Sequence, residues 1–222
     1  MRILPLFLLL VLTPANFTWA ESTINCHCFQ DRAYDPQRTY AADPYFLATT
    51  QNALLANLFG LSKKDVVRAK MGGANGDSLW VGHYLAKKSG KTLDEIKPLF
   101  STGEGWGSVV KQLNIDPEQL GPLFVAALND KHKLATIVVD EQLTENLDVE
   151  MLQLQQLRGQ GADNQQTVIA VFLGHLSNPE PVELFSQVEH GQSSWGNLLA
   201  EQGLFNGSEI EEKWRQILSK NK

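Results

Sequence analysis

The sequence predicts an all-α protein in which two related helical modules follow a cleaved signal peptide. Three observations lead to this prediction: signals for helix starts and ends recur along the chain, strand patterns are scarce, and one helical pattern with a Trp-Gly pair occurs twice. The expected organisation is a signal peptide at 1–20, an extended segment with a Cys-His-Cys sequence at 21–42, and helical modules at 43–130 and 131–222.

The first twenty residues have the pattern of a secretory signal. Arg2 supplies a positive charge, Ile3–Leu12 is an apolar run, and Thr18–Ala20 places small residues where a signal peptidase cleaves. The apolar run is shorter than the roughly 20 residues that a membrane-spanning helix needs. We therefore expect export to the periplasm or the medium, with a mature chain that begins near Glu21. Lipidation of Cys26 is not expected, because no lipobox precedes it.

Capping signals mark the expected helices in chain order. A Ser, Thr or Asp stands before most apolar patterns, where its side chain accepts a hydrogen bond from the helix start, and a Gly follows several of them. The expected starts are Asp43-Pro44, Ser62 with Asp65, Asp77 or Ser78, Thr92, Asp116-Pro117, and Ser208 with Glu211, and the expected ends include Gly60, Gly72 and Gly90. The helix that Thr92 opens is expected to bend or end at Pro98.

The second half of the chain gives one ambiguous signal. Residues 145–158 have apolar side chains at helical spacing, and so does the final helix, whose expected apolar stripe is Ile210, Trp214, Ile217 and Leu218. Residues 134–139 are rich in β-branched side chains and are compatible with a strand, but the sequence offers such a strand no partner, and a single strand makes no sheet.

Residues 78–115 and 167–204 form a faint internal repeat. Trp106-Gly107 aligns with Trp195-Gly196, and an apolar pair follows two residues later in each copy. We favour duplication over chance. Each tryptophan is expected to bury its ring against the preceding helices, and each glycine is expected to leave room for close packing.

The glycines around Trp106 do not predict a phosphate-binding loop. Such a loop follows a strand, whereas Gly103 follows a helical pattern and no Walker lysine comes after it. Residues 106–120 also resemble a helix-turn-helix of DNA-binding proteins. However, the chain has 19 Lys and Arg against 25 Asp and Glu, a formal net charge of −6, and this field repels nucleic acid and anionic membranes. We therefore expect no nucleic-acid partner. No segment after the signal is apolar enough to span a bilayer, so no membrane span is expected either, and a protein is the partner that stays open.

Cys26, His27 and Cys28 are the one stretch that predicts chemistry. The two thiols are the only cysteines of the chain, and an exported protein meets an oxidising environment. A disulfide between Cys26 and Cys28, a thiol-exchange pair, a Zn or Cu(I) site that includes His27, and a bond to a partner chain all stay open. A covalent haem is excluded, because that needs Cys-x-x-Cys-His.

Two segments of the chain resemble a family of exported bacterial helical proteins without an assigned activity. One is Gly103 and Gly105-Trp106-Gly107 with the aliphatic pair after them, and the other is the N-terminal Cys-His-Cys-Phe. Asn114 stands where that pattern usually has glycine. The resemblance implies a helical fold and export, and it transfers no functional residues.

No catalytic residue is predicted. The acidic residues near helix starts are typical of partners for the helix dipole, and the five histidines form no ligand spacing, although His83 and His175 fall in equivalent helices of the repeat. The sequence therefore predicts a non-enzymatic interaction or structural module without a cofactor. The alternative is a thiol-redox or metal-handling protein that uses Cys26, His27 and Cys28.

Overall fold

The computed structural model describes residues 29–100 and 105–220, which form helices connected by turns, with no strand in these ranges. The elements are α1 (Asp43–Leu58), α2 (Lys63–Met71), α3 (Gly76–Ser89), α4 (Leu93–Phe100), α5 (Gly105–Gln112), the short 3-10 helix η1 (Pro117–Leu120), α6 (Pro122–Ala126), α7 (Lys131–Leu147), α8 (Met151–Gly159), α9 (Asn164–Gly174), α10 (Pro181–Glu189), α11 (Trp195–Glu201) and α12 (Gly207–Lys220). The all-α prediction is confirmed for the described residues. None of their helices is both long and apolar enough to cross a bilayer.

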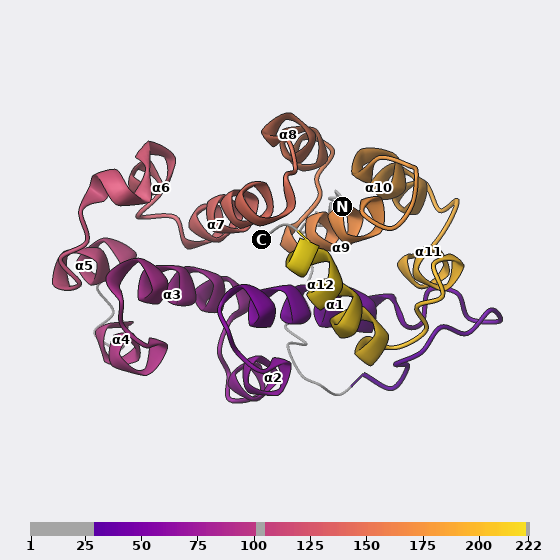
Figure 1. Cartoon of the computed structure of the whole chain (residues 1–222), viewed down its shortest axis with the longest axis horizontal. Coiled ribbons are helices and arrows are strands. Elements are labelled where there is room, and N and C mark those ends of the chain that lie inside the picture. The colour runs from indigo at the N-terminus through magenta and orange to yellow at the C-terminus, as the bar shows by residue number, and fades with distance from the viewer. Residues whose placement is uncertain (1–28, 101–104, 221–222) are drawn as a thin grey trace, which may run out of the picture.

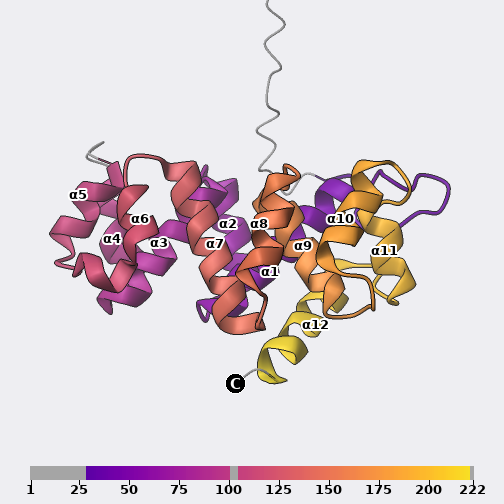
Figure 2. The same cartoon turned by 90° about the horizontal axis from the view of Figure 1, so that it is seen from above.

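The helices are arranged in layers along an elongated molecule (Figure 1). α1 and α3 follow each other through the middle, with α7 packed on α3 and with α9 and α12 packed on α1. α2 and α4 lie on the opposite side of this row from α7 and α9, whereas α8 and α10 lie beyond α9 (Figure 1). Figure 2 shows the same elongated shape from above, with α5 and α6 at one end and α11 at the other.

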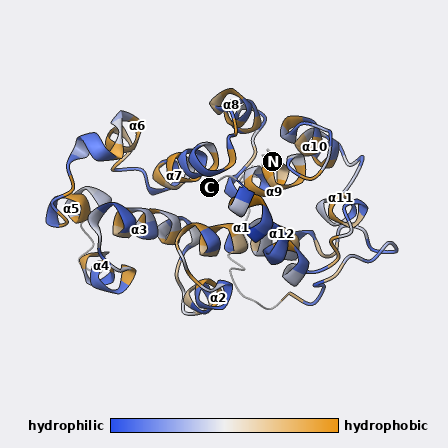
Figure 3. Cartoon of the chain, in the orientation of Figure 1, coloured by the Kyte–Doolittle hydropathy of each residue, from blue (hydrophilic) through white to orange (hydrophobic). Residues whose placement is uncertain are grey.

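α1 is surrounded by other helices, and this explains its unusual composition. Its buried side chains include Thr49, Thr50, Gln51 and Asn52 as well as apolar residues. The Nε1–H of Trp214 on α12 donates a hydrogen bond of 3.1 Å to the carbonyl of Thr50. α4, α8 and α10, at the surface, instead show hydrophilic and hydrophobic residues on the same helix (Figure 3).

Several predicted caps are present, and others are shifted by a few residues. Ser62 accepts from the backbone N–H of Asp65, and Thr92 pairs with Glu95. α3 begins earlier than predicted, because Asn75 caps it, and the last helix is capped by Asn206 rather than Ser208. Neighbouring Asn, Asp and Ser residues are all good caps, so local sequence alone does not choose among them.

The structure decides one assignment that the sequence left open and corrects another. Residues 134–139 lie in the middle of α7, where Val138 and Val139 are fully buried, so tertiary packing overrides the β-propensity of the segment. The predicted helix 145–158 is two helices, because α7 ends at Asp148, whose φ of 55° is left-handed, and α8 begins at Met151.

The predicted boundary between 130 and 131 falls just before α7, and helices from its two sides pack on each other. α3 packs on α7, and the hydroxyl of Tyr84 donates a hydrogen bond of 2.8 Å to Glu141. α1 packs on α9, α11 and α12. The buried apolar residues of both sides form one continuous core.

The two Trp-Gly pairs occupy comparable positions in the two copies of the predicted repeat, but the helices that surround them differ. Both tryptophans are buried, with 8% of Trp106 and 2% of Trp195 exposed. Trp106 lies at the start of α5 and Trp195 at the start of α11, and each of these is the third helix of its repeat copy. α5 packs on α4, however, whereas α11 packs on α9 and α1. A Cβ at Gly196 would lie 3.2 Å from the ring of Phe46, but a Cβ at Gly107 would meet none of the described residues within 4 Å. Close packing therefore explains only Gly196, and the duplication stays a prediction.

Candidate functional site

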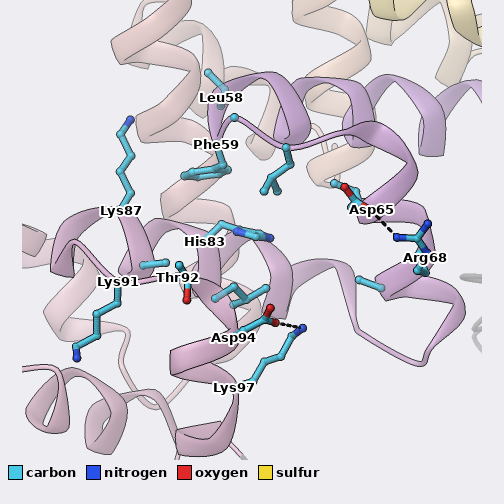
Figure 4. Close-up of a pocket in the computed structure, with 16 residues that line it drawn as sticks. Leu58, Phe59, Asp65, Arg68, His83, Lys87, Lys91, Thr92, Asp94 and Lys97 are labelled. Carbon is cyan, nitrogen blue, oxygen red and sulfur yellow. Dashed lines mark hydrogen bonds and ion pairs between the residues drawn. The ribbon is translucent and has the colours of Figure 1, made fainter.

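A cleft of about 830 Å³ lies between the end of α1, α2, the second half of α3, and α4 (Figure 4). Its walls combine aliphatic and aromatic side chains with charged ones. Two sharp turns shape it. At the end of α1, Gly60 takes a φ of 67°, and at the end of α3, Gly90 takes a φ of 69°, values that glycine adopts without strain.

Hydrogen bonds fix both turns. After Gly60 the backbone N–H of Leu61 donates to the carbonyl of Ala56, and after Gly90 that of Lys91 donates to the carbonyl of Ala86. The caps of α2 and α4 follow within one or two residues. The chain therefore reverses twice beside the cleft through local interactions, and the cleft walls are held in place before any ligand arrives.

An aromatic pair crosses the cleft between α1 and α3. The ring of His83 stacks on that of Phe59, with centroids 5.6 Å apart and an interplanar angle of 24°. The other neighbour of Phe59 is the buried Trp80, whose ring meets it edge-on at 6.0 Å. The Nζ of Lys87 lies 6.0 Å from the centroid of Phe59. In Figure 4 the Phe59 and His83 rings lie one above the other in the middle of the cleft.

His83 is a neutral imidazole at physiological pH. Burial lowers its pKa to about 4, the positive charge of Lys97 adds to this effect, and the charge of Asp94 opposes it. Neither ring nitrogen forms a hydrogen bond with a described residue. A half-buried imidazole with unused donor and acceptor atoms at a cleft is equipped to bind a polar group of a ligand.

The charged side chains of the cleft divide into two groups. Arg68 pairs with Asp65 at 2.6 Å, and Lys97 pairs with Asp94 at 2.7 Å, as Figure 4 shows. Lys87 and Lys91, in contrast, form no ion pair with any described carboxylate. The cleft therefore has a positive balance in a chain whose formal net charge is −6.

The chemistry of the cleft favours binding over catalysis. A histidine with a pKa of about 4 is a weak base near neutral pH, since an efficient general base has a pKa close to the working pH. The His83 ring is oriented by stacking on Phe59, not by a carboxylate of the described chain. These properties suit recognition of a ligand by shape and polarity.

A second polar cluster is closed to solvent. The Nζ of Lys70 donates a hydrogen bond of 2.6 Å to Oδ1 of Asn52, and 8% of Lys70 is exposed. Burial lowers the pKa of this lysine to about 8, although the charge of Asp77 acts in the other direction. The cluster joins α1, α2 and the start of α3 beneath the surface, and it belongs to the interior of the fold.

The residues singled out in the sequence lie elsewhere. Cys26, His27 and Cys28, like the expected signal peptide, lie outside the described residues. Within 29–100 and 105–220 no three His, Cys, Asp or Glu side chains are grouped as metal ligands would be. His83 faces the cleft, whereas Nε2 of His175 lies 3.0 Å from the carbonyl of Leu147, so the two histidines share no site.

Sequence reasoning missed the cleft. Its residues come from four helices, and the one local signal was the i, i+4 spacing of His83 and Lys87, which places both side chains on one face of α3.

Comparisons of this chain with protein-family models, with curated proteins and with solved structures found no match to any of them.

Proposed function

We propose that this protein is an exported, non-enzymatic binding module and that the cleft between α1, α2, α3 and α4 is its ligand-binding site. The observation that carries the proposal is the cleft itself, since its volume of about 830 Å³ falls in the range of roughly 300–1,000 Å³ typical of small-molecule sites. Its lining supplies both an apolar surface and a comparable number of polar and charged side chains, so it can hold an apolar body and a polar group of one ligand.

Preorganisation supports the proposal. Phe59 is held between His83 and the buried Trp80, and the turns at Gly60 and Gly90 are fixed by hydrogen bonds. A ligand that enters such a cleft does not have to order its walls, so less binding free energy is lost.

A blocking substitution tests the proposal. Ala69 lines the cleft and is partly exposed, so Ala69→Phe fills part of the space. The matched control is Ala200→Phe, because Ala200 is also partly exposed. Ala200 belongs to α11, a helix that lies far from α2 and α4 (Figure 1). The probe is 1-anilinonaphthalene-8-sulfonate, titrated by fluorescence. The proposal expects at least about tenfold weaker binding in Ala69→Phe than in Ala200→Phe. Equal affinities in the two variants would reject it.

Export is a separate part of the proposal. Its support is the pattern of Arg2, the apolar run 3–12 and the small residues 18–20. The resemblance to exported helical proteins points the same way. Fractionation of cells that express the full chain, with N-terminal sequencing of the product, tests it: a periplasmic or secreted chain that begins near Glu21 is expected, and an uncleaved chain in the cytoplasm would contradict it.

The spacing of Cys26, His27 and Cys28 supports a second candidate function, thiol exchange or the binding of Zn or Cu(I). Elemental analysis and thiol titration of the mature protein test this candidate. Stoichiometric metal that is lost in a Cys26→Ser, Cys28→Ser double variant would favour it over the cleft as the centre of function. The expected protein partner stays a prediction.

A further inference from the structure

We propose that the ligand of the cleft is an organic anion, whose apolar body packs on Phe59 and whose acid group accepts a hydrogen bond from His83 in the positive field of Lys87 and Lys91. This inference rests on the proposed function, because it names the chemical class that the same cleft selects. It is carried by three independent properties of the cleft: its apolar surface, the unused polar atoms of His83, and the arrangement of its charges.

The apolar surface selects the body of the ligand. Leu58, Leu61 and Leu93 line the cleft together with Phe59, and all are only partly covered by the rest of the protein. A planar or aliphatic group placed there removes apolar surface of both molecules from water, which favours binding. A wholly polar ligand would leave this surface uncovered.

His83 and Lys87 select the head group. They are one turn apart on α3, and both lie within 6.0 Å of the Phe59 ring centroid, measured from the His83 centroid and from the Lys87 Nζ. The imidazole offers one N–H donor with no partner among the described residues, and the ammonium offers three donors with no paired carboxylate. The Lys87 ammonium lies on the other side of the Phe59 ring from His83 (Figure 4). An oxyanion therefore accepts its hydrogen bond from His83, and Lys87 contributes positive charge at longer range.

The remaining charges exclude a cation. Arg68 and Lys97 are already paired with Asp65 and Asp94, so neither carboxylate is free to hold a positively charged ligand. Lys91, in the turn after α3, also lines the cleft and adds to the positive field. A cation would meet this field without a free counter-charge, whereas an anion would neutralise it.

Binding of an anion is expected to be linked to proton uptake by His83. The charged groups around this ring are Lys97 and Asp94 on α4, Lys87 on α3, Lys91 in the following turn, and the Asp65–Arg68 pair on α2. Burial and the charge of Lys97 keep the ring neutral against the opposing charge of Asp94, and an acid group beside the ring would favour its protonated form. The pKa of His83 is thus expected to rise when the ligand is bound.

The test compares three ligands that share one apolar body: 2-naphthoate, 2-naphthylmethanol and 2-naphthylmethylammonium. Their affinities for the full-length mature protein are measured by equilibrium dialysis at low ionic strength. We expect 2-naphthoate to bind at least about tenfold more tightly than the other two, and we expect this preference to fall about tenfold in Lys87→Gln. Lys111→Gln removes the same charge from an exposed position on α5 and is expected to keep the full preference.

The outcomes separate this inference from the proposed function. If all three ligands bind equally and Ala69→Phe weakens all of them, the cleft binds ligands but does not select anions, and the inference is overturned. If Ala69→Phe affects none of them, both proposals fail. Should Lys87→Gln lose its helical circular dichroism, the NMR titration of His83 decides instead: a pKa that rises with 2-naphthoate supports the inference, and an unchanged pKa overturns it.

Discussion

The carboxylate of Asp43, at the start of α1, accepts a hydrogen bond of 2.8 Å from the backbone N–H of Gly196, at the start of α11. Its other oxygen accepts one of 3.2 Å from the N–H of Trp195. The sequence predicted Asp43 as the cap of its own helix, yet Ala42 takes that position without a side-chain bond. Asp43 instead caps a helix more than 150 residues away, in the other half of the chain, and so joins the two halves.

Replacement of Asp43 therefore destabilises the contact between α1 and α11. Asp43→Ala leaves two buried N–H groups without this acceptor, and we expect it to lower the free energy of unfolding by about 2–4 kcal/mol. Asp43→Asn keeps one acceptor oxygen, so its loss is expected to be smaller. Urea unfolding monitored by circular dichroism measures both. Equal stabilities of Asp43→Ala and the parent would contradict the capping role.

The two glycines of the Trp-Gly pairs are predicted to respond differently to alanine. At Gly196 a Cβ would lie 3.1 Å from Tyr34, 3.2 Å from Phe46 and 3.4 Å from Asp43, and the ring of Phe46 is fully buried. At Gly107, inside α5, the Cβ would contact no residue that the structure describes. Gly107→Ala is expected to be neutral or stabilising by up to about 1 kcal/mol, and Gly196→Ala to be destabilising by about 1–3 kcal/mol.

Thermal and urea unfolding of the two variants, made in the same background, give this comparison. Because each change adds one methyl group to a helical glycine, each serves as the control for the other. Equal shifts of the free energy of unfolding in the two variants would mean that the two glycines have equivalent surroundings. This result would contradict the close packing that we assign to Gly196 alone.

Buried Lys70 is predicted to make stability depend on pH in the alkaline range. Its pKa is about 8 in the folded chain against 10.5 for an ordinary lysine, so unfolding takes up a proton between these values. The free energy of unfolding should therefore rise with pH from about 8 to 10.5, by roughly 3 kcal/mol, and this group should add no pH dependence below 8.

Lys70→Met isolates this effect, because all other titrating groups are retained. The difference in unfolding free energy between parent and variant is measured at pH 7.5, 9 and 10.5. We expect the parent to gain relative to Lys70→Met as the pH rises. A constant difference would show that the Lys70 pKa is the same in the folded and unfolded chain. Asn52→Ala, which removes the acceptor of Lys70, is expected to destabilise the parent most below pH 8.

The parts of the fold that local sequence determines were predictable. Ser62 and Thr92 cap their helices because each finds its partner three residues later, and the stripe of Ile210, Trp214, Ile217 and Leu218 is buried as its spacing indicates. The helix at 134–139 was not predictable in this way, since the packing of α7 on α3 decides it. For the same reason the candidate site escaped the sequence: Phe59 and His83 meet only because α2 and its two flanking turns bring the end of α1 against α3.

The position of a bound ligand tests the central claim most directly. The measurement is a set of intermolecular nuclear Overhauser effects between 2-naphthoate and the side chains of the ¹³C-labelled protein. The account predicts contacts from the naphthalene protons to the rings of Phe59 and His83. Contacts confined to other surfaces, such as the exposed Met151 and Leu152 on α8, would contradict it.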